Sequence, residues 1–422
     1  MEQAQAPQKE SLFRSLVKLK GNARCCVYTE PMWGIPYNLY IPYASLYMSL
    51  LGLGDAQIGL IASIGMACQV VVAVLSGIIT DKMGRRKATV VFDILSWSVP
   101  CLIWAVAQNF WYFVAAIIVN SLWRVTENSW KLLLVEDTPK NQLVPIFTWV
   151  SISGLLSAFF APLSGLLVKS VDVVPAMRIL YLISFVLMTA KFLILFVVGK
   201  ETRIGQIRME ETRHVSWGAM FREYGGVIRQ MLHNPGTLLA LGVMVVHTIG
   251  SNTFGTFFGL LATDQLGMPN EFLAVYPVFR SLLMLVFFFG VMPRISRMRK
   301  PHIALAVGFC CYTASCLLLV GMPADSVPLM ILCALLQGCG EAMVMPLMET
   351  MVVVNVDDKE RARIMGLMYM VVLLFSSPFG YIAGLMSAAN RTLPFILNAG
   401  MFLLGCVLAL ASGRSARPAD AA

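Results

Sequence analysis

Residues 77–87 read Gly-Ile-Ile-Thr-Asp-Lys-Met-Gly-Arg-Arg-Lys, and this short charged stretch separates two long apolar runs. Each run is about as long as a helix that spans a membrane, so we expect a tight basic turn at the membrane surface. Gly84 permits a sharp turn. The Asp81 carboxylate is close in sequence to the Arg85 guanidinium, and such a pair can hold one helix end against another. The stretch therefore predicts a structural latch and not a catalytic site.

The composition places the rest of the chain in a lipid bilayer. Of 422 residues, 58% are hydrophobic and 13% are charged, with a mean hydropathy of +0.74, which excludes an ordinary soluble protein. We predict an all-α integral membrane protein. Twelve apolar runs are long enough to be membrane-spanning helices: 27–50, 57–80, 88–108, 110–135, 143–168, 176–199, 236–262, 271–292, 302–322, 326–352, 362–387 and 391–412.

The distribution of basic residues predicts the orientation. Lys and Arg gather in 1–24, 82–87, 200–229, 294–300 and 359–363. The alternate loops hold Lys169, Arg178 and Arg391. Because basic loops stay in the cytoplasm, we expect a multi-pass protein of the inner (plasma) membrane with both termini cytoplasmic. This bias also accounts for the net charge of +9 without a nucleic-acid partner, and the polar N-terminal 24 residues do not resemble a signal peptide.

The pattern Gly-x-x-x-Asp-Lys-x-Gly-Arg-Arg-Lys, between the second and third predicted helices, resembles the loop motif of the major facilitator superfamily (MFS) of secondary transporters. The resemblance implies two pseudo-symmetric six-helix bundles around a central cavity. It also implies that charged residues near the loop form a latch at a cytoplasmic gate. The residues predicted for this gate are Gly77, Asp81, Gly84, Arg85, Arg86, Asp93, Glu136 and Asp137.

A weak internal repeat agrees with two halves, because Leu51-Gly52 corresponds to Leu266-Gly267 and Glu127 to Glu341. We predict a cytoplasmic tail (1–24), an N-terminal bundle (25–199), a cytoplasmic linker (200–235), a C-terminal bundle (236–413) and a second tail (414–422). In the linker, apolar residues recur at helical spacing between Ser216 and Asn234. This spacing predicts an amphipathic helix on the membrane surface.

Charged residues inside the predicted helices are the candidates for function, because they are costly in lipid and usually face a cavity. Asn120, Arg124, Glu127 and Lys131 are spaced by four, three and four residues and so share one helix face. Arg124 also resembles the buried arginine of the family's fourth-helix motif. We predict proton coupling by Glu127, Glu341 and Arg124, since a carboxylate in a low-dielectric site can exchange a proton as its surroundings change. The alternative is a purely structural ion pair.

The first and seventh predicted helices contribute further polar and aromatic side chains that suit ring-bearing, sugar-like or cationic ligands. The predicted substrate cavity comprises Trp33, Tyr37, Asn38, Tyr40, Asn120, Arg124, Glu127, His247, Asn252, Gln337 and Glu341. The ten cysteines show no metal-binding spacing. We therefore predict no metal site and no cofactor.

No nucleotide-binding loop or catalytic triad is present in the sequence, so we predict neither an enzyme nor an ATP-driven pump. The prediction is a monomeric secondary transporter that moves a small organic solute by alternating access, coupled to protons, with export slightly favoured. An importer of a sugar-like or zwitterionic nutrient, or a uniporter, is the alternative within transport. A receptor or scaffold that moves no solute is the alternative of another class.

Overall fold

The computed structural model describes residues 16–139, 142–213, 234–291, 301–354 and 361–415, and within these ranges the chain is helical and contains no strand. Nine helical runs in the described residues are long and apolar enough to cross a membrane. They are α5 (Asp55–Met83), α6–η2–α7 (Arg85–Asp93, Ile94–Ser98, Val99–Ala105), α10–η4–α11 (Leu143–Ser157, Ala158–Phe160, Pro162–Val171), α12 (Val173–Val198), α16–η5 (Pro235–Leu260, Leu261–Gln265), α19 (Pro301–Gly321), α20 (Val327–Val354), α21 (Arg361–Ala389) and α22 (Leu393–Ser415).

The other three predicted segments are also helical, but each is interrupted. The first consists of α2 (Gly21–Thr29), α3 (Pro31–Tyr40), η1 (Ile41–Tyr43) and α4 (Ala44–Leu50), the fourth of α8 (Phe110–Asn120) and α9 (Trp123–Val135), and the eighth of η6 (Asn270–Ala274), α17 (Tyr276–Val286) and η7 (Phe287–Val291). Pro31 and Pro42 stand at two breaks in the first segment, because proline lacks the amide hydrogen that would continue the helix. These nine runs and the three further segments thus account for the twelve predicted segments in the described residues.

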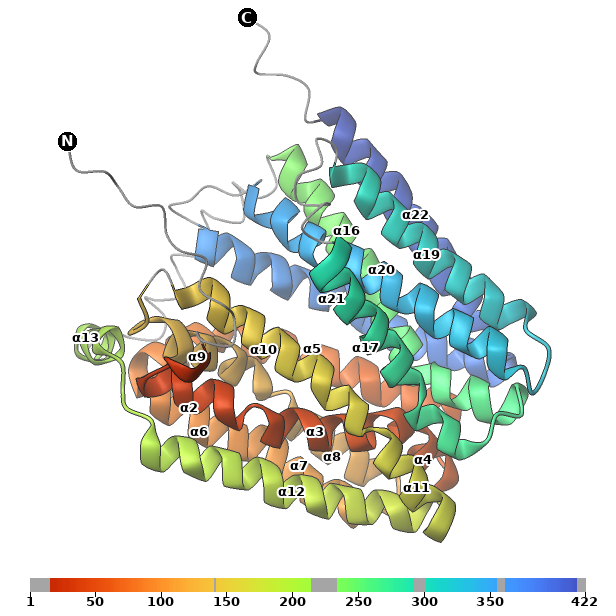
Figure 1. Ribbon diagram of the computed structural model, residues 1–422, viewed down its shortest axis with the longest axis horizontal. Coiled ribbons are helices and arrows are strands. Elements are labelled where there is room, and N and C mark those ends of the chain that lie inside the picture. The colour runs from red at the N-terminus through yellow and green to blue at the C-terminus, as the bar shows by residue number, and fades with distance from the viewer. Residues whose placement is uncertain (1–15, 140–141, 214–233, 292–300, 355–360, 416–422) are drawn as a thin grey trace, which may run out of the picture.

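The helices form two groups, which Figure 1 shows as one group from α2 to α12 and another from α16 to α22. Between the groups, α5 packs along α21, α10 contacts α17, and α4 contacts α16. This is the expected arrangement of two bundles. The boundaries predicted for them, 25–199 and 236–413, remain a proposal.

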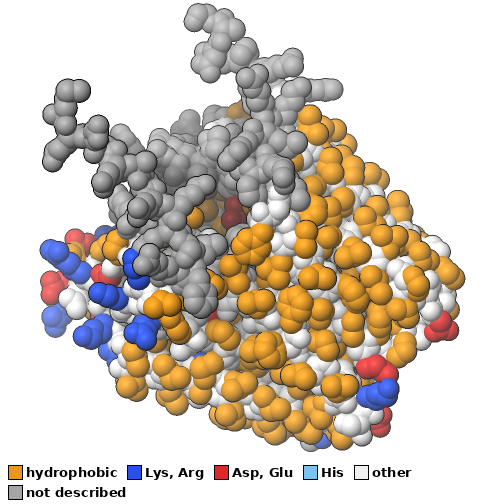
Figure 2. All heavy atoms as spheres, in the orientation of Figure 1, with side chains coloured by type: hydrophobic (Ala, Val, Ile, Leu, Met, Phe, Trp, Pro, Cys, Tyr) orange, Lys and Arg blue, Asp and Glu red, His pale blue; other side chains and the backbone are white. Residues whose placement is uncertain are grey.

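The face of the molecule drawn in Figure 2 carries a broad hydrophobic belt, with charged side chains gathered at its two ends. On α12, for example, Val186 is 60% exposed and Val197 is 79% exposed. Exposed apolar side chains on this scale are stable only in lipid. The chain is therefore a multi-pass membrane protein.

We call the end that contains residues 81–87 and 200–213 the basic end, and the end that contains residues 51–54 and 390–392 the opposite end. At the opposite end the bundles touch through backbone: a Cβ atom on Gly59 would lie 2.3 Å from the Gly380 carbonyl oxygen. Arg391 bonds Asp264 at 2.9 Å and reaches Asp55 at 3.5 Å. These contacts close this end of the space between the bundles.

At the basic end, the linker begins with a helix that the sequence did not predict, α13 (Arg203–Thr212), which packs against α5. Thr202 caps this helix by accepting a hydrogen bond from the Gly205 amide at 2.9 Å. The amphipathic helix predicted between Ser216 and Asn234 lies outside the described residues, apart from its last residue, which caps α16.

Candidate functional site

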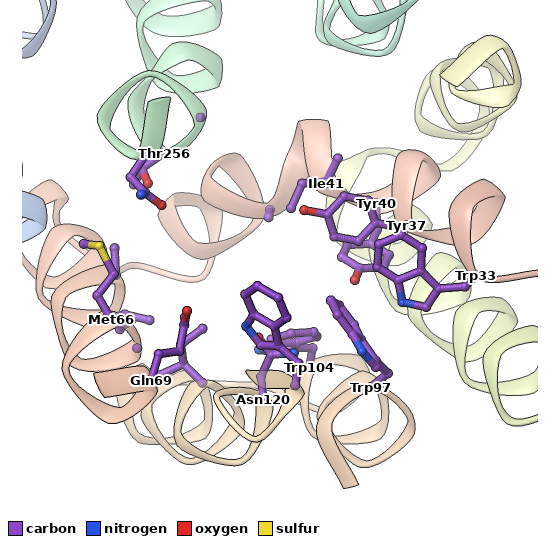
Figure 3. Close-up of a pocket in the computed structure, with 18 of the residues that line it drawn as sticks. Trp33, Tyr37, Tyr40, Ile41, Met66, Gln69, Trp97, Trp104, Asn120 and Thr256 are labelled. Carbon is purple, nitrogen blue, oxygen red and sulfur yellow. The ribbon is translucent and has the colours of Figure 1, made fainter. Parts of the chain in front are cut away.

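A cavity of about 700 Å³ lies between the bundles. The N-terminal bundle supplies most of its wall, and α16 of the C-terminal bundle supplies Ser251, Asn252, Gly255 and Thr256. Figure 3 shows Thr256 across the cavity from Gln69 and Asn120. A cavity of this volume accommodates a drug-sized molecule.

One wall of the cavity is aromatic, as Figure 3 shows. Trp33 stacks on Tyr37 with 4.9 Å between ring centroids, and the edge of Trp97 meets Trp33 at 5.1 Å. Tyr40 extends the wall to Tyr181, 5.1 Å away. The rings come from α3, the η2 turn and α12, and they hold one another in fixed orientations.

Six of the residues predicted for the cavity line it: Trp33, Tyr37, Tyr40, Asn120, Glu127 and Asn252. Two of the amides are already engaged, since Asn120 donates to the Ser96 carbonyl at 2.7 Å and Asn252 donates to the Thr248 carbonyl at 2.9 Å. Asn38 lies outside the lining and donates to the Gly34 carbonyl of its own helix at 2.8 Å. Its expected place in the wall is thus corrected, because Asn38 follows Tyr37 by one residue and so points about 100° away around α3.

The charged face of α9 points inward as a three-residue cluster. Arg124 lies 2.6 Å from Glu127, and Lys131 reaches the other oxygen of that carboxylate at 3.2 Å. Arg124 also donates to Gln69 at 3.0 Å, and its guanidinium lies 4.1 Å from the centre of the Trp123 ring. Glu127 lines the cavity, whereas Arg124 lies behind it.

The predicted residues of the C-terminal bundle lie beyond the cavity lining. Glu341 pairs with Arg280 at 3.4 Å. His247 is buried, with its Nε2 atom 3.4 Å from the Tyr312 hydroxyl and 3.3 Å from that of Ser251. Gln337 is also buried, and its side-chain oxygen has no hydrogen-bond partner among the described residues. Glu127 and its repeat counterpart Glu341 thus each have an arginine partner.

A third charged cluster lines the cavity near the break between α2 and α3. Lys191 of α12 bonds Glu30 at 2.8 Å and interacts electrostatically with Asp93 of α6. This placement corrects the assignment of Asp93 to the gate. Asp93 follows Arg85 by eight residues on one helix, which is about 12 Å along its axis, so the two side chains do not meet. Glu30 and Lys191 lie 161 residues apart, so no local sequence pattern pairs them.

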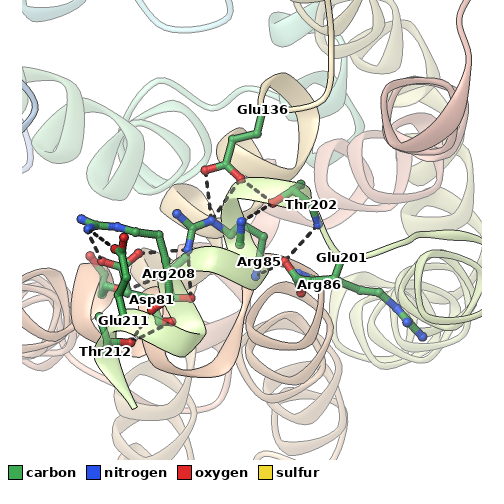
Figure 4. A network of polar contacts seen from close by, with 12 residues as sticks. Asp81, Arg85, Arg86, Glu136, Glu201, Thr202, Arg208, Glu211 and Thr212 are labelled. Carbon is green, nitrogen blue, oxygen red and sulfur yellow. Dashed lines mark hydrogen bonds and ion pairs between the residues drawn. The ribbon is translucent and has the colours of Figure 1, made fainter. Parts of the chain in front are cut away.

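The basic stretch forms the network drawn in Figure 4. Helix α5 continues to Met83 and α6 begins at Arg85, so the turn consists of Gly84 alone, at φ 83°. The Arg85 guanidinium bonds Asp81 at 2.9 Å and Glu136 at 3.0 Å. Arg85 is almost completely buried, so both ion pairs are shielded from water.

The network contains a carboxylate that sequence reasoning missed. Glu201 accepts hydrogen bonds from the backbone amides of Arg85 at 2.8 Å and Arg86 at 3.0 Å, and so caps the start of α6. Thr202 hydrogen-bonds Glu136, and Lys82 donates to the Thr212 carbonyl at 3.0 Å. No local pattern links residue 201 to a loop more than one hundred residues earlier.

Two side chains predicted for the gate contact groups other than Arg85. The Arg86 guanidinium points away from the Arg85 pairs and donates to the Phe196 carbonyl at 2.5 Å. Asp137 accepts from the Arg203 amide at 3.3 Å. Gly77 lies inside α5. The latch joins parts of the N-terminal bundle and the linker to one another, through the contacts of Asp81, Arg85 and Glu136.

The comparisons with known proteins agree with this geometry. The family model of the Major Facilitator Superfamily matches residues 34–324 and 297–421. The chain belongs to this superfamily. It is 27% identical over 174 residues to the multidrug resistance protein MdtG of Serratia proteamaculans (strain 568), an alignment that spans 40% of this chain and 41% of the relative.

Solved structures of the superfamily share the fold at low sequence identity. The nucleoside transporter NupG matches with a TM-score of 0.70 and 14% identity over 93% of this chain and 99% of its own. A POT family transporter in complex with 5-aminolevulinic acid matches with a TM-score of 0.71 and 13% identity, over 93% of this chain and 96% of its own. Membership of the superfamily makes this chain a secondary transporter of a small molecule and not an enzyme.

Proposed function

We propose that this MFS member exports a small organic solute in exchange for protons. The observation that supports the proposal is the cavity of about 700 Å³, in which aromatic rings adjoin ionised side chains that meet one another and not lipid. The resemblance to a protein named for multidrug resistance favours export over uptake. A nutrient importer and a uniporter are the competing modes of transport.

The arrangement of the two ends suits alternating access. Backbone contacts at Gly59 and the ion pairs of Arg391 close the opposite end in this structure. We propose that the basic end is cytoplasmic, in an inner membrane, and that the transporter acts as a monomer. The latch around Arg85 then fixes the cytoplasmic ends of α5, α6 and α9 as one body while the bundles rock.

For the coupling step, we propose that Glu127, Glu341 and Arg124 respond to the proton and the solute. Glu127 is held by two cations in this conformation and lines the cavity. A solute that enters the cavity, or a change in its walls as the bundles rock, changes the field at this carboxylate and hence its affinity for a proton.

The decisive experiment is transport in proteoliposomes under an imposed pH gradient, screened over pools of small organic solutes. The wild type is compared with Glu127→Gln and Glu341→Gln. We expect flux that depends on the gradient in the wild type and loses that dependence in either variant. Asp325→Asn is the matched control, because Asp325 is an exposed carboxylate at the opposite end.

Each other outcome selects an alternative. Equal proton-coupled flux in all proteins removes the two glutamates from coupling. Flux through the wild type that does not depend on the pH gradient indicates a uniporter. If neither the wild type nor either variant carries any solute, the protein is a receptor or scaffold on the same fold.

A further inference from the structure

Four of the ten cysteines form two pairs of facing thiols in the C-terminal bundle. Cys310 and Cys311 are neighbours on α19, which Figure 1 shows between α20 and α22. The Sγ atom of Cys310 lies 3.6 Å from that of Cys406 on α22, and we call these two residues the α22 pair. The Sγ atom of Cys311 lies 3.7 Å from that of Cys339 on α20, and we call these two the α20 pair. All four are free thiols, and none of them lines the cavity.

Close packing of the helices sets the distance between the thiols of each pair. Next to the α20 pair, Gly308 and Gly340 bring two backbones together, since a Cβ atom on Gly340 would lie 3.0 Å from the Gly308 carbonyl oxygen. Next to the α22 pair, a Cβ atom on Gly405 would lie 2.7 Å from the ring of Phe309. A cysteine side chain is short, so the separation of its sulfur atom from a neighbour follows the separation of the backbones.

Both pairs lie at the depth of the hydrocarbon core. Cys310 and Cys311 are halfway along α19 (Pro301–Gly321), about 15 Å from either end of the helix. The α22 pair opens to lipid, because Cys310 is exposed and its neighbours on α22 include Leu403, 52% exposed, and Val407, 61% exposed. A ligand that reaches these thiols from the bilayer must be apolar, and a product that carried a net charge would be costly there.

The spacing of the sulfur atoms indicates what can bridge them. Two sulfur atoms that each form a bond of about 2.3 Å to one central atom, at an angle of about 100–110°, lie about 3.5–3.8 Å apart. A linear two-coordinate ion such as Cu⁺ needs about 4.6 Å at the same bond length. A direct bond between the sulfurs needs about 2.05 Å. The observed separations of 3.6 and 3.7 Å fit the bent bridge without movement of the helices.

The number of ligands then selects the central atom. Zn²⁺ has a suitable angle but takes four ligands, and among the described residues no group of three or more His, Cys, Asp or Glu side chains could hold a metal ion. A trivalent arsenic atom that carries an organic group brings its own third bond and is pyramidal. It needs only two thiols from the protein, and its product with them is uncharged.

We propose that each of the two pairs is a binding site for an apolar organic compound of trivalent arsenic, an arsenoxide. Two S–H bonds break and two As–S bonds form, and the oxygen of the arsenoxide leaves as water with both protons. Arsenic stays trivalent, so the reaction needs no oxidant or reductant. Each bridge joins α19 to a neighbour within one bundle. The inference is independent of the direction and coupling of transport.

The test counts the arsenic groups that the protein binds. Purified full-length protein in detergent is reduced with a phosphine, freed of it, and incubated with phenylarsine oxide. Intact-protein mass spectrometry then gives the number of adducts. We expect two phenylarsenic groups per chain, each with the loss of two hydrogen atoms. Dimercaptopropanol, a dithiol, should remove both groups, whereas a monothiol at the same thiol concentration should leave them, because each bridge is a chelate.

Single substitutions assign each group to a pair. Cys310→Ala and Cys311→Ala should each bind one group, and the double variant none. Alanine is apolar and favours a helix, so the variants should fold, and size-exclusion chromatography checks this. Cys406→Ala and Cys339→Ala remove the partner thiols and should give the same counts, which keeps the test valid if an α19 variant misfolds. Cys101→Ala is the matched control, because Cys101 is a buried cysteine on α7, and it should bind two groups.

A second measurement reports whether the bridges join helices. The α20 pair spans 28 residues and the α22 pair spans 96 residues of chain, and a cross-link over such a loop restricts the unfolded chain. Phenylarsine oxide should therefore raise the unfolding temperature of the wild type. It should leave that of the Cys310→Ala, Cys311→Ala double variant unchanged.

Two bound groups on the double variant, or none on the wild type, overturn the inference. A single group on the wild type overturns it for the pair whose variants leave that count unchanged. Cys25 and Cys26, neighbours on α2, are the competing dithiol. Loss of a group in Cys26→Ala, with unchanged counts in the α19 variants, also overturns the inference. None of these results bears on transport, which the proteoliposome experiment tests separately.

Discussion

At the scale of single residues, the buried charges are stable because each finds an opposite charge. Arg85 has two carboxylate partners, Glu127 has two cationic partners, and Lys191 bonds Glu30. Removing one member of such a group leaves its partner uncompensated, which costs more than the net value of the pair. A neutral substitution at one of these sites therefore removes an ion pair and also leaves the partner charge uncompensated.

Glu201 gives a residue-scale prediction. Its two carboxylate oxygens cap the first two amides of α6. Glu201→Gln keeps the shape but leaves one acceptor oxygen for two amides, so we expect a loss of about 1–2 kcal/mol in stability. Thermal unfolding in detergent, followed by intrinsic fluorescence, measures it.

The matched control is Glu210→Gln, because Glu210 is an exposed glutamate on α13. We expect its unfolding temperature to equal that of the wild type. A Glu201→Gln protein as stable as this control would show that the cap does not hold α6 in place.

At the scale of elements, the three interrupted segments contribute much of the charged and aromatic chemistry. The α2–α3 break presents Glu30, α9 presents Arg124 and Glu127, and α17 presents Arg280. Short helical pieces can reorient where a continuous helix would be held by its own hydrogen bonds. The long α5 and α21, in contrast, provide the glycine-lined contact between bundles.

The α5–α21 contact gives an element-scale prediction. A Cβ on Gly59 would lie 2.3 Å from the Gly380 carbonyl oxygen and 2.8 Å from the Gly384 Cα atom. Gly59→Ala should therefore separate the helices at a cost of about 1–3 kcal/mol in this conformation, which lowers the equilibrium ratio of this conformation to the others by about 5- to 150-fold. We expect transport in proteoliposomes to fall accordingly while the protein still folds.

Gly400→Ala on α22 is the control, because nothing lies within 4 Å of a Cβ placed there. It adds the same methyl group to an exposed helix face and should leave transport unchanged. Equal transport by both variants would mean that close approach of α5 and α21 is not required in the cycle.

At the scale of the whole molecule, the two ends of the cavity differ. The bundles are tied at the opposite end through Asp55, whose carboxylate accepts from Ser387 at 2.5 Å and approaches Arg391 at 3.5 Å. The latch at the basic end ties α5, α6, α9 and α13 to one another. The contacts at the opposite end therefore join the two bundles, whereas the latch at the basic end stiffens the N-terminal bundle.

This difference gives a prediction at the scale of the molecule. Asp55→Cys combined with Ser387→Cys places two thiols where a hydrogen bond now joins the bundles. Oxidation should lock the opposite end closed and abolish transport, and reduction should restore it. Each single variant under the same oxidant is the control for the native cysteines. Full transport by the oxidised, cross-linked double variant would show that this end need not open.

Part of the site could be predicted from local sequence. The spacing within 120–131 placed Asn120, Glu127 and Lys131 on one face, and Glu127 does line the cavity. Asp93 was assigned to the gate because it follows the basic turn, but its helix carries it towards Lys191. Glu201 was missed because its partners lie far away in sequence.

The sequence by itself determined that this protein is a membrane-spanning bundle of the superfamily, because hydropathy, basic loops and helical periodicity are local properties that the bilayer enforces. Only the tertiary structure decided which charges meet. The pairing of Glu30 with Lys191, the cap of Glu201 on α6 and the contact of α5 with α21 each join distant segments. Such contacts depend on how whole helices pack, and no short stretch of sequence carries that information.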